Sequence, residues 1–138
     1  MRALVDTSVW SLALRREDPS DRKKNATTVQ ALSRLIEEAG AFIVGPIRQE
    51  ILSGISDEKQ YEKLRRHLRA FDDLPLTTEI WERAAQFSNR CRRAGVQGSH
   101  TDFLLCAAAD AYRLPVFTTD KDFQYYAKVL GVSLLSFP

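Results

Sequence analysis

The sequence predicts an α/β fold, a three-layer α/β/α sandwich around a central and mainly parallel β-sheet. Short apolar runs of strand length alternate along the chain with longer segments of helical periodicity. Strands that alternate with helices form parallel sheets that helices cover on both faces. The chain has 138 residues, which is the size of about one domain. We therefore expect a single domain over residues 1–138.

The first half of the chain opens with a buried apolar strand and continues mainly in helices. Apolar side chains at Leu32, Leu35 and Ile36 recur every three or four residues, which is typical of a helix face. Gly45 and Pro46 form a turn that places proline at the first position of a helix. The expected spans are a strand at 2–5, a helix to 14 capped by Thr7 or Ser8, a loop at 16–25, a helix at 27–39, a strand at 42–44, a helix from 46 to about 55 and a helix at 57–71.

The second half predicts a helix that is buried nearly all round. Residues 101–113 carry apolar side chains on most faces, which is the pattern of a helix inside the core. The other expected spans are an extended segment at 74–76, a helix from its cap Thr78 to about 94, a glycine-containing loop at 95–100, a strand at 115–118, a short helix opening at 119–123 and a last strand at 132–135.

Composition excludes several classes of protein. No apolar run approaches the roughly 20 residues of a membrane helix, and the first residues lack the long apolar region of a secretory signal. We therefore expect a cytoplasmic protein that does not enter a membrane. Cys91 and Cys106 lack metal-ligand spacing and are expected to be buried apolar residues. Basic clusters such as 63–69 and 90–93 suit either a phosphate backbone or solvated helix faces.

Acidic residues follow the predicted strands and converge on one edge of the sheet. Asp6 ends the first strand, Asp120 follows the strand at 115–118, and Glu50 lies about one helical turn beyond the strand at 42–44. Ligands of parallel sheets bind at the carboxyl ends of the strands. Asp102, in the first turn of the buried helix, and Asp122 are further candidates.

Each acid alone has an ordinary explanation, because carboxylates are favourable near helix N-termini. Gathered together, they repel one another and raise one another's pKa, so a stable fold needs a cation among them. Carboxylate oxygens without histidine or cysteine suit Mg²⁺ or Mn²⁺. Such an ion can activate a water and neutralise charge on a phosphoryl group, which predicts phosphodiester hydrolysis. The chain has no lysine-bearing phosphate loop, so nucleoside triphosphate chemistry is not indicated.

Four motifs in order resemble the PIN domain, and within it the VapC toxins of bacterial toxin–antitoxin pairs. The resemblance spans essentially the whole chain, including its length and the order of motifs. The motifs are LVDTSVW at 4–10, RQEILSG at 48–54, TDFLLCAAA at 101–109 and TTDKDF at 118–123.

This resemblance implies a set of roles for the acidic residues. Asp6, Glu50, Asp102 and Asp120 match the metal-binding acids of the family, and their presence implies an active copy. Three further residues match supporting positions of the family. Asp122 matches an acid that assists through water, and Ser8 or Thr7 matches the hydroxyl that steadies Asp6.

The resemblance also implies an activity and partners. It implies endonucleolytic cleavage of RNA with Mg²⁺ or Mn²⁺ by a homodimer. The mechanism expected here is attack of a metal-bound water on phosphorus with the 3′ oxygen leaving, which gives 5′-phosphate and 3′-hydroxyl ends. A cognate antitoxin would inhibit it by laying a C-terminal segment across the acidic groove. His100 departs from the pattern, and we expect it in a loop or facing substrate. The RNA target and the number of metal ions stay open.

Other functions fit the residues less well. A PIN-like module that binds RNA or a partner without cutting is the main alternative, and the complete acidic set disfavours it. A phosphatase of the haloacid dehalogenase type needs a second aspartate where this chain has Ser8. A receiver-type signalling domain needs a phosphoacceptor aspartate after a middle strand, where this chain has Gly45 and Pro46.

Overall fold

Three short parallel strands form the centre of the protein. The computed structural model describes residues 1–14 and 19–136. The sheet has the order β2-β1-β3, with β1 (Ala3–Val5) in the middle, β2 (Ala41–Phe42) on one side and β3 (Val116–Phe117) on the other. Both pairings are parallel. The parallel sheet predicted from the sequence is therefore confirmed.

The strands are shorter than the sequence predicts. Beyond β2, Ile43 forms only an isolated parallel bridge with Asp73. The predicted last strand at 132–135 is likewise reduced to one bridge, between Val116 and Leu134. Apolar runs mark where a strand is buried, but the pairing that defines its length depends on the neighbouring chain.

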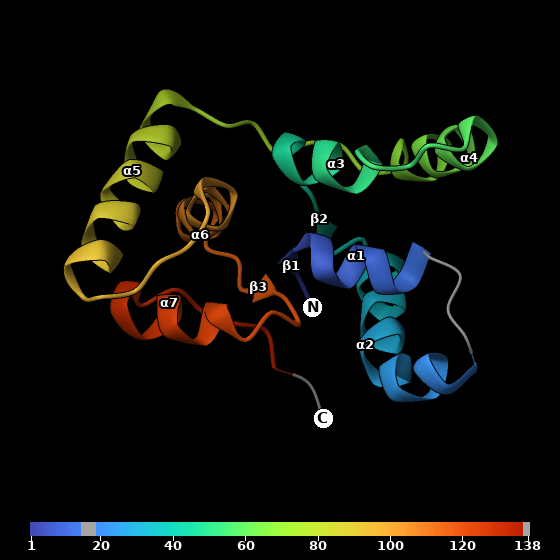
Figure 1. The fold of residues 1–138 in the computed structure, drawn as a ribbon, viewed down its shortest axis with the longest axis horizontal. Helices are drawn as coiled ribbons and strands as arrows, with labels where there is room; N and C mark the ends of the chain where they lie inside the picture. Colours follow the sequence, from blue (N-terminus) through green and yellow to red (C-terminus); the bar gives the residue numbers. More distant parts are fainter. Residues whose placement is uncertain (15–18, 137–138) are drawn as a thin grey trace.

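Helices lie on both sides of the strands in two groups (Figure 1). One group contains α1 to α4, in which α1 packs against α2 and α3; the other contains α5 to α7, in which α5 packs against α6 and α7. The bounds are α1 Thr7–Leu14, α2 Pro19–Glu37, α3 Gly45–Leu52, α4 Glu58–Leu68, α5 Thr78–Arg93, α6 His100–Tyr112 and α7 Asp122–Leu130. The predicted α/β/α arrangement is confirmed.

The loop predicted at 16–25 is wrong from Pro19 onward, because α2 begins there. Proline is favourable in the first turn of a helix, and the arginine and lysines that follow are good helix formers. A polar segment with a proline is typical of a loop, but this composition does not exclude a helix that begins at the proline. The first part of the predicted loop, residues 16–18, lies outside the described residues.

Two helix ends also differ from the prediction. The helix expected to reach about 55 ends at Leu52, because Ser53 is extended and Gly54 takes a φ of +84°. The cap of α5 is Thr77 rather than Thr78, since the Thr77 hydroxyl accepts the N–H of Ile80 at 3.3 Å. The backbone geometry decides which residue is the cap. The sequence alone does not show which of two adjacent threonines takes that position.

The hydrophobic core surrounds the sheet and takes buried side chains from both groups of helices. As predicted, α6 is buried on most sides, from Phe103 to Ala109. Cys91 on α5 and Cys106 on α6 are free thiols within this core, also as predicted. No helix in the described part of the chain is both long and apolar enough to span a membrane.

A tryptophan on α1 joins that helix to the central strand. Trp10 is 1% exposed, and its indole N–H donates to the Val5 carbonyl at 3.2 Å. Its ring meets Phe71 edge-on at 5.0 Å between centroids. The position of Asp6, which joins β1 to α1, is therefore fixed.

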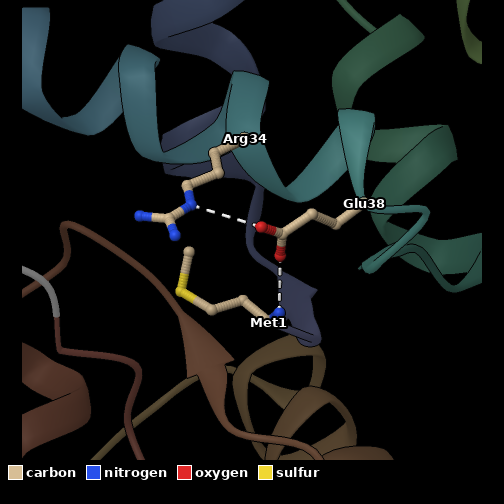
Figure 2. A network of polar contacts seen from close by, with 3 residues as sticks. All are labelled: Met1, Arg34 and Glu38. Carbon is tan, nitrogen blue, oxygen red and sulfur yellow. Dashed lines mark hydrogen bonds and ion pairs between the residues drawn. The ribbon is translucent and has the colours of Figure 1, made fainter.

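The start of the chain is tied to the end of α2 by a charged network at the surface. The amino group of Met1 lies 2.6 Å from Glu38 Oε2, and Arg34 Nε donates to Glu38 Oε1 at 3.2 Å (Figure 2). The two cations lower the pKa of the Glu38 carboxyl. Because the pairs are exposed, they contribute little to the stability of the fold.

Candidate active site

Asp6 is the buried acid at the carboxyl end of the central strand. Its residue is 7% exposed, and one carboxylate oxygen, Oδ2, accepts hydrogen bonds from two hydroxyls. Ser8 Oγ donates at 2.8 Å and Thr118 Oγ1 donates at 2.8 Å. Among the described residues no side chain donates to the other oxygen, Oδ1. One oxygen is thus held in place while the other stays available to a ligand.

The same two hydroxyls shape the turn after β3. Ser8 Oγ accepts the N–H of Thr119 at 3.1 Å, and Thr118 Oγ1 accepts the N–H of Asp120 at 3.0 Å. Asp120 Oδ1 in turn accepts the N–H of Asp122 at 2.9 Å. This chain of contacts brings the exposed acids Asp120 and Asp122 to the strand edge that carries Asp6.

Asp102 is fixed in the first turn of α6 at two points. Its backbone N–H donates to the side chain of the N-cap residue Ser99 at 3.1 Å. The hydroxyl of Tyr126, on α7, donates to Asp102 Oδ2 at 2.8 Å. Burial raises the pKa of the Asp102 carboxyl, hydrogen bonds to that carboxyl from Tyr126 and Ser99 partly offset the rise, and the charge of Asp6 adds to it.

Glu50 faces the same region from α3. Partial burial raises the pKa of the Glu50 carboxyl, and the charges of Asp6 and Asp102 raise it further. The Thr7 hydroxyl lies close enough to oppose this rise in pKa. That hydroxyl is buried and has no hydrogen bond of good geometry. Asp6, Glu50 and Asp102 therefore act on one another electrostatically, as carboxylates do when they face a shared space.

The comparisons with known proteins identify the fold family. A family model described as the PIN domain matches residues 3–129. The chain belongs to the PIN domain family. It is 31% identical over 138 residues to the VapC ribonuclease Mb1587 of Mycobacterium bovis, with 97% of this chain and 98% of that protein covered. The resemblance to VapC proteins is therefore confirmed.

Solved structures show the same PIN fold. FitAcB from Neisseria gonorrhoeae superposes with a TM-score of 0.76 at 22% identity, covering 97% of this chain and 96% of that one. A toxin-antitoxin complex from Klebsiella pneumoniae gives a TM-score of 0.65 at 24% identity, covering 97% of this chain and 96% of that one. At these identities the similarity establishes the fold.

The donor chemistry of this PIN site fits a hard divalent cation. The four predicted acids supply only carboxylate oxygens, which are the ligands that Mg²⁺ and Mn²⁺ prefer. Over residues 1–14 and 19–136, no three His, Cys, Asp or Glu side chains converge closely enough to enclose an ion. Mg²⁺ commonly takes one or two protein carboxylates and keeps several waters. The carboxylates match that open mode of binding, and their roles as ligands stay predictions.

Two residues of the network were not assigned a role from the sequence. Thr118 bridges Asp6 and Asp120, and Tyr126 reaches Asp102. Thr118 is a polar residue directly after an apolar strand, and this place in the sequence could have indicated a role at the site. Tyr126 lies four residues after Asp122 on α7, so the two share a helix face, but only the packing of α7 near α6 directs the hydroxyl at Asp102.

His100 does not belong to this hydrogen-bond network. It is the first residue of α6, so its expected place in a loop is wrong. The cap at Ser99 starts the helix one residue before the predicted start. His100 is exposed and lines a surface cavity of about 310 Å³ with Trp81 and Phe103.

Proposed function

We propose that this protein is a VapC-type endoribonuclease that depends on Mg²⁺ or Mn²⁺ and acts as the toxin of a toxin–antitoxin pair. The observation that carries the proposal is the Asp6 carboxylate, held through one oxygen at the end of the central strand beside Glu50 and Asp102. Membership of the PIN family and the likeness to a protein named VapC ribonuclease support RNA as the substrate.

The residues of the site divide the work of phosphodiester hydrolysis. A bound divalent ion would lower the pKa of a water and neutralise charge on the phosphoryl group. Asp6, Asp102, Asp120 and Glu50 would hold that ion directly or through water. Burial first, and then the charges of neighbouring carboxylates, raise the pKa values of Glu50 and Asp102, and a bound cation would favour their ionised forms. Ser8 and Thr118 keep Asp6 oriented. Asp122, exposed at the rim, would orient water.

The proposal includes partners and a place of action. A cognate antitoxin would cover the acidic edge, and a neighbour of the same fold is described as part of a toxin-antitoxin complex. We propose a homodimer as the active form, on the family resemblance. We propose that the protein acts in the cytoplasm, where an RNA substrate is available.

The test compares Asp6→Asn with the wild-type chain on RNA. Asparagine keeps the shape of the side chain and an oxygen for the two hydroxyls but removes the negative charge. We expect the purified, partner-free wild type to cut total RNA with Mg²⁺ or Mn²⁺ and not with EDTA. Asp6→Asn should be slower by more than about 100-fold, since even supporting residues of metal sites contribute about 10- to 100-fold. Asp72→Asn, at an exposed aspartate between α4 and α5, is the matched control.

The second candidate is a PIN domain that binds RNA or a partner without cutting it. The observation in its favour is that no three acidic, histidine or cysteine side chains of the described residues enclose an ion. Cleavage at the wild-type rate by Asp6→Asn, or no cleavage with any metal by a folded wild type, would reject the nuclease. Retained binding of labelled RNA in that case would identify the binding module.

A further inference from the structure

Tyr126 places a buried hydroxyl on one of the proposed catalytic acids. The residue is 1% exposed, and its hydroxyl donates to Asp102 Oδ2 at 2.8 Å. Its ring packs against Phe103 and Phe123, each with 5.1 Å between ring centroids. Aromatic neighbours on two elements leave the ring little freedom to turn, so the hydroxyl is held toward Asp102.

The loop before α6 is shaped to accept this tyrosine. A Cβ atom at Gly98 would overlap the Tyr126 hydroxyl and would lie 2.7 Å from Cζ and 2.9 Å from Cε1 of the ring. Real contacts are not that short, so any larger residue at 98 would displace the ring. Glycine is needed here for space. The hydroxyl also lies 3.5 Å from the carbonyl oxygen of Gln97, in the same loop.

Asp102 and Asp6 are held in the same manner. Each carboxylate has Oδ2 bound by a hydroxyl donor from a distant part of the chain, Thr118 for Asp6 and Tyr126 for Asp102. Among the described residues no side chain donates to Oδ1 of Asp6, and the Asp102 carboxyl is further held by hydrogen bonding from Ser99, which lowers its pKa. Ser99 fixes the backbone of Asp102, and Tyr126 fixes the end of its side chain. A cation that binds either aspartate then meets a carboxylate that needs no reorientation.

We propose that Tyr126 is a positioning residue that fixes the side chain of Asp102 in the orientation that binds a divalent cation. The inference rests on the proposed function, because it concerns the same site. The alternative is that Tyr126 has only a structural role. A buried tyrosine hydroxyl needs a hydrogen-bond partner whether or not that partner binds an ion. Loss of the hydroxyl would then lower stability and leave ion binding unchanged.

The experiment replaces only the hydroxyl. Tyr126→Phe keeps the ring packing, and Tyr125→Phe makes the identical change at the neighbouring residue, which is 57% exposed. Mn²⁺ binding to each purified, partner-free chain is measured by titration calorimetry without RNA. Thermal unfolding is measured in EDTA. We expect Tyr126→Phe to weaken Mn²⁺ binding by about 10-fold, as loss of an orienting partner does at other metal sites. We expect Tyr125→Phe to match the wild type in both measurements.

A second variant reaches the hydroxyl from the other side. Gly98→Ala displaces the Tyr126 ring without removing its hydroxyl. It should weaken Mn²⁺ binding in the wild-type chain and have a smaller further effect in the Tyr126→Phe chain, because the hydrogen bond to Asp102 is already absent there. Equal effects in the two backgrounds would contradict the proposed route through Tyr126.

The outcomes separate this inference from the function on which it rests. If the wild type binds Mn²⁺ and Tyr126→Phe binds it equally well, the positioning role is overturned and the metal-dependent nuclease stands. If the folded wild type binds no Mn²⁺, the metal-dependent function is overturned and the inference with it. Weaker binding in Tyr126→Phe with unchanged unfolding in EDTA supports both.

Discussion

At the scale of single residues, two hydroxyls link the acids of the site. Ser8 and Thr118 each donate one hydrogen bond to Asp6 and each accept one backbone N–H from the turn after β3. A hydroxyl has one proton to donate and two lone pairs that accept, so both hydroxyls use their single donor and at least one acceptor site in this network. The position of Asp6 and the path of the chain toward Asp120 are therefore set by the same contacts.

Thr118→Val tests this link, because valine keeps the shape of threonine and removes its hydroxyl. Asp6 loses one donor and the N–H of Asp120 loses its acceptor. We expect RNA cleavage to fall by about 10-fold and the free energy of unfolding to fall by about 1 kcal/mol. Thr119→Val is the control, because Thr119 is exposed and contributes its backbone N–H to the network. Equal cleavage by the two variants would contradict the role of Thr118.

The raised pKa of Asp102 predicts how stability varies with pH in the metal-free protein. Burial favours the neutral carboxyl in the folded state, so the folded protein holds this proton to higher pH than the unfolded chain. The stability that comes from the proton is complete below the ordinary pKa of 3.8 and is lost as pH rises through the folded value.

Asp102→Asn removes this titration. The free energy of unfolding of the variant should therefore rise relative to that of the wild type as pH increases. Denaturant unfolding in EDTA at about pH 4 and about pH 7 measures the difference in unfolding free energy between the two proteins. We expect asparagine to be the more favourable residue at the higher pH. A difference that shrinks between the lower and the higher pH would contradict the raised pKa.

At the scale of elements, helix ends decide where the chain turns into the sheet. Ala39, just after α2, takes a φ of 55°, and Gly40 follows it as a buried residue against the backbone of Met1. The N–H of Gly40 donates to the carbonyl of Leu35 at 2.7 Å, and its own carbonyl accepts from Ala3 at 2.8 Å. This turn therefore connects the end of α2 to the central strand.

The left-handed conformation of Ala39 predicts a stabilising substitution. Such a conformation costs a non-glycine residue about 1 to 2 kcal/mol, so Ala39→Gly should raise the free energy of unfolding by up to about 1 kcal/mol after the entropy cost of glycine. Gly95→Ala is the opposite case, with a φ of +76° and no atom within 4 Å of the added methyl group. It should lower stability by about 1 kcal/mol. Denaturant unfolding compares the two, and effects of the same sign would reject the explanation.

At the scale of the whole molecule, the site joins both groups of helices. Asp6 directly follows the central strand, Glu50 lies on α3 of the first group, and Asp102 lies on α6 of the second. A cation bound among them would connect segments that are distant in sequence. Because it would bind the folded chain and not the unfolded one, it should shift the folding equilibrium.

Added Mn²⁺ should therefore raise the midpoint of thermal unfolding of the wild type. At about 100 times the dissociation constant the gain in free energy is about 2.7 kcal/mol. Asp6→Asn should show little of this shift. EDTA should reverse the shift in the wild type, and an equal rise in both proteins would place Mn²⁺ binding elsewhere on the chain.

The sequence by itself determined the order of strands and helices, the parallel sheet and the burial of α6. These follow from local periodicity, because a strand or helix must bury its apolar face. It also placed Asp6 and Asp120 at one strand edge, since parallel strands end on the same side. Asp6 carried this prediction because it directly follows an apolar run.

The tertiary structure decided the features that depend on contacts between distant segments. The polar start of α2 contains no apolar pattern that would mark it as helical, so it was misread. The hydrogen bonds from Thr118 to Asp6 and from Tyr126 to Asp102 join residues 112 and 24 positions apart. Side-chain direction at such distances is set by how α7 and β3 pack, because no local rule relates residues that meet only after the chain folds.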